Sequence, residues 1–359
     1  MPHIAPSLGH HTGTVLLALC CACLCSATNT AATNNAPIIG ILSVPIQDQQ
    51  CITALDDPSK APGGGSCFHS LYTKFVESAG ARVVPIRYDA SDAELRRLFR
   101  SVNGVLFTGG EVDIKHQADD ASAQYMHAAS LLYNATLTAH DGGEYVPLWG
   151  TCMGVQTLAI LGAGSGDVLS SGSFDSEDES LALDLAPAAA ASRMFGNSFP
   201  TAAPADTVLK WLTTENVTSN LHHDGLEPAV FAASAAAAVF DVLATDLDRK
   251  GKPFIAVLES KSYPVYGTQY HPERPMFEWA GGELGIDHGA HAVAASQWHA
   301  NFLVAEARKN SHRFDSAKEE QAALIYNYQP TGTTSYQAYH FEPAADDAKL
   351  PRPQHGHRL

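Results

Sequence analysis

The chain has 359 residues, of which 45% are hydrophobic and 17% are charged, and its 38 acidic and 22 basic residues give a formal net charge of −16 at pH 7. So much apolar sequence excludes a chain that is disordered as a whole, and the length allows one large or two modest domains. The acidic balance, without a dense cluster of Lys and Arg, argues against nucleic acid as a partner and, at first sight, against any polyanionic substrate.

The first 27 residues predict a cleaved secretory signal. Residues 15–25 are an unbroken apolar run of 11 residues, which is too short to cross about 30 Å of hydrocarbon. Small residues at Cys25 and Ala27 match the small-x-small pattern of a cleavage site. A flexible tail or a buried helix is the alternative, because no Lys or Arg precedes the apolar run. No later run is long enough for a membrane anchor.

Removal of the signal leaves three of the seven cysteines, Cys51, Cys67 and Cys152. In an oxidising compartment an odd number suggests one disulfide and one free thiol. Cys51 and Cys67 flank a loop rich in Pro and Gly and could pair, which would leave Cys152 free. Sequons at Asn134 and Asn216 predict N-glycosylation and agree with passage through the secretory pathway.

Strand and helix patterns alternate through the first half of the remaining chain. Buried or β-branched runs predict strands at residues 37–44, 81–86, 104–107 and 145–149. Helical periodicity predicts helices at residues 68–79, 93–99, 121–138 and 155–161, with Gly80 and Gly162 as stops. This alternation predicts an α/β fold, a three-layer sandwich with a mostly parallel central sheet.

The second half is regular only after a stretch that resists assignment. Residues 170–238 hold acidic, Ser-rich and Ala-rich segments without a clear period. Beyond them the predicted elements are, in chain order, a strand pair at residues 239–245 and 254–258, a last strand at residues 265–270 and a long helix at residues 290–309. Since no linker divides residues 28–342, we expect them to form a single catalytic domain, followed by a disordered tail at residues 343–359.

A cysteine version of the nucleophile elbow joins a predicted strand to a predicted helix. In Gly150-Thr-Cys152-Met-Gly154 the glycines allow a sharp turn, so the Cys152 side chain projects above the edge of the sheet. The helix that follows favours the thiolate through its dipole, and the Met153 N–H faces an oxyanion formed at an attacked carbonyl. The pattern predicts that Cys152 is a nucleophile; an inert cysteine at a tight turn is the alternative.

His271 and Glu273, just after the last predicted strand, supply what a thiol nucleophile needs. Imidazole is the usual general base, and the carboxyl ends of parallel strands meet at the edge where α/β proteins place their sites. Pro272 stiffens the link, so that Glu273 can turn back and orient the ring. A single histidine among 17 is more often structural, but its combination with the elbow favours catalysis.

A glycine pair after a third strand completes the predicted site. Thr108-Gly109-Gly110 presents backbone N–H groups that no side chain hinders, and we take Gly110 as the second oxyanion donor beside Met153. A glycine-rich turn without function is the alternative reading. We predict no metal, because the adjacent pairs His10–His11 and His222–His223 lack further partners at ligand spacing.

At these residues the sequence resembles the class I glutamine amidotransferase-like superfamily and, more narrowly, the eukaryotic γ-glutamyl hydrolases. The matching stretches include PIIGIL (residues 37–42), ESAGARVVPIR (77–87), NGVLFTGGEVD (103–113), PLWGTCMG (147–154), SRMF (192–195) and YPVYGTQYHPE (263–273). They span nearly the whole chain after the signal. The resemblance implies hydrolysis of γ-glutamyl peptide bonds in folylpoly-γ-glutamates without a cofactor, in a lysosome, a vacuole or the medium, by an enzyme that is often a homodimer.

Carried over by position, the resemblance makes Cys152 the nucleophile, His271 the general base and Glu273 the residue that orients it. It also implies substrate contacts, which fall on Tyr72, Gly109, Gln156, His222 and, as one candidate for the substrate carboxylates, Arg193. Two positions depart from the family pattern. Gln156 stands where these hydrolases usually have Glu, and Cys67 stands where an aromatic residue is usual.

Two other functions remain open at this stage. Gln156 resembles the amidotransferases and would suit a glutaminase domain that feeds ammonia to a synthase, although the signal and the lack of a synthase domain argue against it. A secreted binding protein of the same fold is the other alternative. If the substrate is a polyglutamate, the charge of −16 offers no long-range attraction at neutral pH, so binding is expected to strengthen as pH falls toward the pI of about 5.4.

Overall fold

The computed structural model describes residues 1–3, 33–48, 51, 65–196, 199, 203–279, 285–332 and 337–343. The chain groups into two units, Met1–Ala32 and Thr33–Leu359, and the second unit is described below. Apart from residues 1–3, the predicted signal peptide lies outside the described residues, and so does the predicted tail from residue 344 onward.

Among the described residues, eight strands form one sheet in the order β4-β1-β5-β6-β12-β11-β10-β8. Neighbours among the first five strands run parallel, and β11, β10 and β8 extend the sheet with antiparallel neighbours. In chain order the strands are β1 (Ile38–Leu42), β4 (Arg82–Ile86), β5 (Gly104–Phe107), β6 (Leu148–Thr151), β8 (Asp184–Leu185), β10 (Phe240–Leu247), β11 (Pro253–Ser260) and β12 (Val265–Thr268). Because parallel strands are covered on both faces, they read as continuous apolar runs, which made most of them visible in the sequence.

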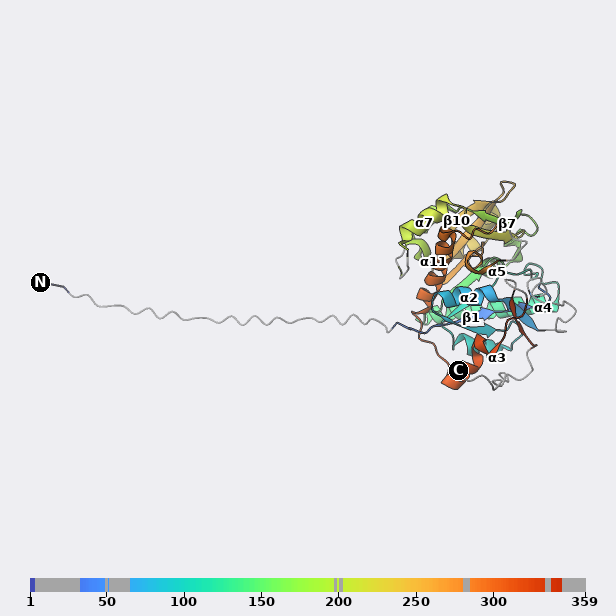
Figure 1. The fold of residues 1–359 in the computed structure, drawn as a ribbon, viewed down its shortest axis with the longest axis horizontal. Helices are drawn as coiled ribbons and strands as arrows, with labels where there is room; N and C mark the ends of the chain where they lie inside the picture. Colours follow the sequence, from blue (N-terminus) through green and yellow to red (C-terminus); the bar gives the residue numbers. More distant parts are fainter. Residues whose placement is uncertain are drawn as a thin grey trace. The chain divides into compact units, whose positions relative to one another are not determined.

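Helices cover both faces of this sheet (Figure 1). The side chains of β1 alternate between two cores: Ile38 and Leu42 pack with α3, α4 and α5, whereas Ile39 and Ile41 pack with α2, α7 and α11. These helices are α2 (Ser70–Ser78), α3 (Asp92–Phe99), α4 (Asp120–Asp141), α5 (Met153–Ala163), α7 (Ala205–Thr214) and α11 (Ala290–Ala307). The predicted three-layer α/β sandwich, the fold expected of the superfamily that the sequence resembles, is confirmed.

Two smaller sheets complete the described part of the chain. One has the order β13-β3-β2 and the other pairs β7 with β9. Their strands are β2 (Val44–Pro45), β3 (Ser66–His69), β7 (Ser176–Leu181), β9 (Thr218–His222) and β13 (Ala338–Phe341). A disulfide joins Cys51 to Cys67 of β3, with 5.7 Å between the Cα atoms. The pairing suggested by the sequence is therefore present in the structure.

The unassigned stretch at residues 170–238 is largely regular. It contains β7, β8 and β9 and four helices: α6 (Arg193–Gly196), α7, α8 (Pro228–Ala233) and α9 (Ala236–Val239). The other short helices are α10 (Arg274–Phe277) and α12 (Ala317–Ala323). Most of these elements have fewer than ten residues, too few for a period to stand out against the Ser- and Ala-rich background.

Several predicted boundaries were wrong. The helix predicted at residues 68–79 begins at Ser70, because residues 66–69 form strand β3, which pairs with β2 and β13. The helix predicted at residues 155–161 begins at Met153 and continues through Gly162 until Gly164, where the backbone becomes left-handed (φ 68°). The strand at residues 265–270 ends at Thr268 and is followed by β13, so it is not the last.

Candidate active site

Cys152 lies in a strained turn between β6 and α5. Its backbone has φ 52° and ψ −112°, a conformation that L-residues rarely adopt. The two glycines of the motif are required by close packing: a Cβ on Gly150 would lie 2.5 Å from the Gly154 carbonyl carbon, and one on Gly154 would lie 2.3 Å from the Phe107 carbonyl oxygen of β5. The Cys152 N–H donates to the Thr268 carbonyl oxygen at 2.7 Å, which ties the turn to the end of β12. This is the elbow that the sequence predicted.

His271 and Glu273 form a buried pair just beyond β12. The His271 Nδ1–H donates to Glu273 Oε1 at 2.7 Å, and both residues are at most 5% exposed. A carboxylate at Nδ1 fixes the tautomer, so Nε2 is the ring nitrogen that faces the reaction. Burial lowers the pKa of His271, but the Glu273 carboxylate and the Cys152 sulfur outweigh burial and raise that pKa to about 9. The imidazole is therefore largely protonated at neutral pH.

Three residues converge around Gly109, at the end of β5. A Cβ built on Gly109 would lie 2.9 Å from His271 Cε1, 2.9 Å from the Tyr72 hydroxyl and 3.4 Å from Cys152 Cβ. The Cys152 sulfur lies close enough to the His271 ring to contribute to the raised pKa of His271. The structure thus brings together the predicted nucleophile, the predicted base and two of the predicted substrate contacts.

Of the backbone N–H groups near the sulfur, one already donates a hydrogen bond within the protein and two do not. The Gly109 N–H donates to the Tyr72 hydroxyl at 2.8 Å. Gly110 has φ 153°, which favours glycine. Within the described residues, no hydrogen bond uses the N–H of Gly110 or of Met153, the two predicted oxyanion donors. An oxyanion hole needs donors that are not already taken, so these two remain suited to that role and Gly109 does not.

Comparison with known proteins identifies the family. The family model described as Peptidase C26 matches residues 37–273. The curated mouse γ-glutamyl hydrolase is 39% identical over 85% of this chain and 90% of its own length. For γ-glutamyl hydrolase B of Dictyostelium discoideum the values are 37%, 84% and 80%, and for human γ-glutamyl hydrolase they are 37%, 86% and 89%.

The chain belongs to the peptidase C26 family. The model match ends at Glu273, the residue that holds the His271 ring, so it covers all three members of the predicted Cys-His-Glu set. The resemblance to γ-glutamyl hydrolases drawn from the sequence is confirmed, and a cysteine-type hydrolase is the class of enzyme that this membership supports.

In this C26 peptidase, strand β9 brings a second histidine to the site. The Leu221 carbonyl oxygen lies 3.9 Å from Cys152 Sγ, and the backbone N–H of His271 donates to the Ser219 carbonyl oxygen at 2.8 Å. His222 donates from Nδ1 to the Asp224 carbonyl oxygen at 2.9 Å. Its Nε2 is buried without a hydrogen-bond partner among the described residues. Burial lowers the pKa of His222 to about 3, so this ring is neutral and presents a lone pair.

The side chain of Gln156 is buried, and its amide donates to groups of the protein itself. Its Nε2 donates to the Asp224 carbonyl oxygen at 3.0 Å and to Gln269 Oε1 at 3.1 Å. Gln269 in turn donates from Nε2 to Cys152 Sγ at 3.5 Å. The sequence interpretation missed Gln269, although its place two residues before His271, at the same strand end, was a signal that could have found it.

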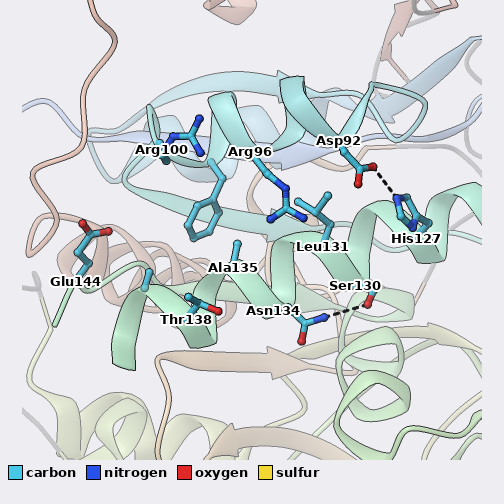
Figure 2. Close-up of a pocket in the computed structure, with 12 residues that line it drawn as sticks. Asp92, Arg96, Arg100, His127, Ser130, Leu131, Asn134, Ala135, Thr138 and Glu144 are labelled. Carbon is cyan, nitrogen blue, oxygen red and sulfur yellow. Dashed lines mark hydrogen bonds and ion pairs between the residues drawn. The ribbon is translucent and has the colours of Figure 1, made fainter. Parts of the chain in front are cut away.

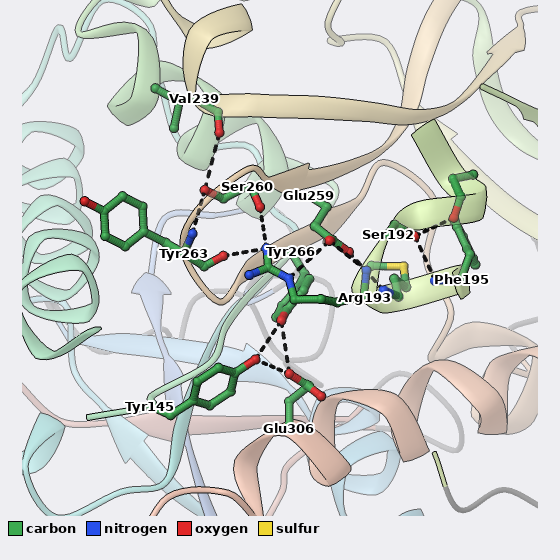
Figure 3. Close-up of polar contacts among 12 residues, drawn as sticks. Tyr145, Ser192, Arg193, Phe195, Val239, Glu259, Ser260, Tyr263, Tyr266 and Glu306 are labelled. Carbon is green, nitrogen blue, oxygen red and sulfur yellow. Dashed lines mark hydrogen bonds and ion pairs between the residues drawn. The ribbon is translucent and has the colours of Figure 1, made fainter. Parts of the chain in front are cut away.

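Arg193 is not brought to the site. Its guanidinium donates to the Tyr263 carbonyl oxygen at 2.7 Å, to the Ser260 carbonyl oxygen and to Glu259 Oε1 (Figure 3). These acceptors flank the turn between β11 and β12, the end of β12 opposite His271. The expected contact with substrate carboxylates therefore has no support from its position, because the guanidinium instead holds the hairpin together.

The two sequons are accessible and lie apart from the catalytic residues. Asn134 is exposed on α4, where it lines a hollow of about 440 Å³ between α3 and α4 together with Arg96 and Arg100 (Figure 2). Asn216 is exposed in the loop between α7 and β9. None of the predicted catalytic residues lines the hollow. Within the described ranges, no group of three or more His, Cys, Asp or Glu could hold a metal ion, and no described helix is long and apolar enough to cross a membrane.

Proposed function

We propose that this protein hydrolyses γ-glutamyl peptide bonds in folylpoly-γ-glutamates through a thioester on Cys152. The observation that carries the proposal is that a strained Cys152 lies beside the buried His271–Glu273 pair in a member of the C26 family. The relatives named above are γ-glutamyl hydrolases, and each matches this chain along most of its own length. The folate part of the substrate comes from the resemblance seen in the sequence.

The first half of the reaction forms the thioester. The Cys152 thiolate attacks the γ-carbonyl carbon, and the carbonyl π electrons move to oxygen, where the N–H groups of Gly110 and Met153 donate to the oxyanion. The His271 imidazolium gives its Nε2 proton to the leaving amine as the C–N bond breaks. Since the pKa of His271 is raised to about 9, the proton that the leaving group needs is present before the substrate binds.

The second half of the reaction returns the enzyme. His271, now neutral, takes a proton from water as that water attacks the thioester carbon. The second tetrahedral intermediate collapses, the C–S bond breaks and the thiolate leaves beside the imidazolium. Throughout, Glu273 accepts the Nδ1–H of His271 and keeps Nε2 directed at the sulfur.

A defined folate pentaglutamate tests the proposal. Mass spectrometry of the products should detect shortened folylpolyglutamates and released glutamate or glutamate peptides, and the product set tells terminal from internal cleavage. The matched variant Cys152→Ala should lose turnover and keep its unfolding temperature. Full activity in Cys152→Ala would overturn the mechanism. Ammonia released from free glutamine, with the folate substrate untouched, would indicate a glutaminase, and no turnover of either would indicate a binding protein.

We also propose that the enzyme works in the secretory pathway, in a lysosome or vacuole, or outside the cell. The Cys51–Cys67 disulfide and the two exposed sequons are consistent with an oxidising compartment. Expression in a eukaryotic host should yield a protein that begins near residue 28 and loses mass on treatment with a glycosidase. A chain that retains residues 1–27 and carries no glycan would contradict this. Sedimentation of the same preparation tests the predicted homodimer.

A further inference from the structure

Two glutamine side chains connect a backbone carbonyl to the sulfur of Cys152. Gln156 donates both of its N–H groups, one to the Asp224 carbonyl oxygen at 3.0 Å and one to Gln269 Oε1 at 3.1 Å. Gln269 then donates from Nε2 to Cys152 Sγ at 3.5 Å. Both glutamines are at most 3% exposed, so water does not compete for these bonds.

The Asp224 carbonyl oxygen, where this series of hydrogen bonds begins, determines the donor and the acceptor of each bond. A backbone carbonyl can only accept, so the Nε2 side of Gln156 must face Asp224. The second N–H of that amide must then meet an acceptor, which places the oxygen of Gln269 toward Gln156 and its NH₂ group toward the sulfur. Turning the Gln269 amide over would set an N–H against the N–H of Gln156 and a lone pair against the sulfur.

We propose that Gln156 is a positioning residue that keeps an N–H donor on the Cys152 thiolate, acting through Gln269. A thiolate that accepts a hydrogen bond is stabilised relative to the thiol, because the bond is stronger to the charged form. This inference rests on the proposed function only in taking Cys152 as the nucleophile. Its test uses no γ-glutamyl substrate, so the two can fail separately.

The same Asp224 carbonyl also accepts from His222 Nδ1 at 2.9 Å. One backbone oxygen therefore orients both the amide chain behind the sulfur and the histidine that β9 places near it. A carbonyl oxygen has two lone pairs and can hold both donors. Loss of Gln156 leaves the bond to His222 in place, so a variant at position 156 tests the amide chain alone.

A carboxyl group at position 156 would make the hydrogen bond from Gln269 to the sulfur depend on pH. A protonated carboxyl has one O–H to give to Gln269, whereas a carboxylate has none and would draw the Gln269 NH₂ group away from the sulfur. An amide donates at every pH. The other titratable or charged groups around the sulfur and His222 stay the same in every variant below; they are Tyr72, His222, His223, Asp224, Asp248, His271, Glu273 and Arg274.

The experiment measures the rate at which iodoacetamide alkylates Cys152 in the full chain between pH 5 and 9, followed at the Cys152 peptide by mass spectrometry. Gln156→Met should slow alkylation by about tenfold over the pH range in which the thiol is only partly ionised, as expected for the loss of a hydrogen bond to a charged group. Gln156→Glu should react almost like the wild type at the acid end and fall toward Gln156→Met as the pH rises. Gln321→Glu, on the exposed face of α12, is the matched control for the added charge and should behave like the wild type.

A double variant tests whether Gln156 acts through Gln269. Gln269→Met should slow alkylation at least as much as Gln156→Met does, and combining the two substitutions should add nothing further. Wild-type rates in Gln156→Met would overturn the proposal, and so would a double variant that is much slower than Gln269→Met. The acid recovery of Gln156→Glu is compared with the unfolding temperature of that variant at each pH, because an ionised carboxylate in a buried site also destabilises the fold. Absence of that recovery in a variant that unfolds at the wild-type temperature also counts against the proposal.

Discussion

Two buried polar clusters lie at opposite ends of β12, and they use their polar atoms differently. At the hairpin end, Arg193 donates to Glu259 and lies over the ring of Tyr266, 5.1 Å from its centroid (Figure 3). The Tyr266 hydroxyl in turn bonds with Tyr145 and Glu306, and no buried side-chain polar atom of these five residues lacks a partner. At the carboxyl end lies the Cys152–His271–Glu273 site. There, by contrast, some polar atoms remain without partners.

The catalytic end retains features that the structural end does not have. His222 Nε2 and Glu273 Oε2 are buried without a hydrogen-bond partner among the described residues, and the Cys152 backbone is strained. Each of these costs free energy in the folded protein. The contrast between these two clusters is that the hairpin-end cluster uses all of its buried polar atoms to hold the chain together, whereas the catalytic end keeps unpaired polar atoms and a strained nucleophile.

The largest effect is expected from Glu273→Gln. Removing the carboxylate takes away the larger of the two effects that oppose burial, so the pKa of His271 falls from its raised value of about 9 and the ring is less protonated at neutral pH. The turnover number should fall by about 10³- to 10⁴-fold, as in other triads that lose the orienting carboxylate. Steady-state kinetics on a γ-glutamyl peptide, with a thermal melt of the same variant, measures it.

The pH profile sharpens the same prediction. In the wild type, activity should decline as pH rises through about 9, because deprotonation of His271 removes the acid that the leaving amine needs. In Glu273→Gln the remaining activity should decline at lower pH, since the pKa of the ring has fallen. An alkaline limb at the same pH in both proteins would show that Glu273 does not hold the proton on His271.

At the hairpin end the expected effect is on stability. Arg193→Met leaves the buried Glu259 carboxylate without its cation and should lower the free energy of unfolding by about 3 kcal/mol, while the turnover number stays within about twofold of the wild type. Urea unfolding and kinetics on one preparation measure both. Arg100→Met, at an exposed arginine of the turn after α3, is the control and should change stability by about 0.5 kcal/mol at most. A large fall in activity for Arg193→Met would break the division between the two ends.

A smaller loss of stability is expected from Tyr145→Phe. The Tyr145 hydroxyl donates to Glu306 and lies 3.0 Å from the Tyr266 hydroxyl. Its removal leaves Glu306 with its bonds from Tyr266, at 3.1 Å, and from Lys309, so the cost should be about 1 kcal/mol. Urea unfolding measures it. A loss as large as that of Arg193→Met would show that the network responds as one unit rather than bond by bond.

The smallest effect concerns substrate affinity at the catalytic end. His223, beside His222, pairs with Glu177, and this hydrogen bond raises the pKa of His223. As pH falls, His223 and other histidines gain positive charge, so the protein becomes less repulsive toward a polyglutamate. The Michaelis constant should therefore fall by about two- to threefold from pH 7 to pH 5. Kinetics at two salt concentrations measures it, since screening should reduce the effect. A Michaelis constant that does not fall would contradict the expectation, and His223→Gln should weaken the trend.

Sequence alone determined the layered α/β fold and which strands are followed by the residues that carry the chemistry. The parallel strands are buried on both faces, so their apolar runs stand out without knowledge of their neighbours. The elbow around Cys152 and the short His271–Glu273 link are local as well: their geometry depends on residues a few positions apart. A pattern within one short segment can therefore be interpreted from that segment.

Only the tertiary structure decided which distant segments meet. β3 is a strand because β13 and β2 pair with it, and Arg193 holds a hairpin because Glu259 and the Tyr263 carbonyl lie beside it. The hydrogen bonds from Asp224 through Gln156 and Gln269 to Cys152 join three separate parts of the sequence. Contacts of this kind depend on how strands and loops pack in space, which no local period records, and they determine which polar groups support the structure and which remain for the reaction.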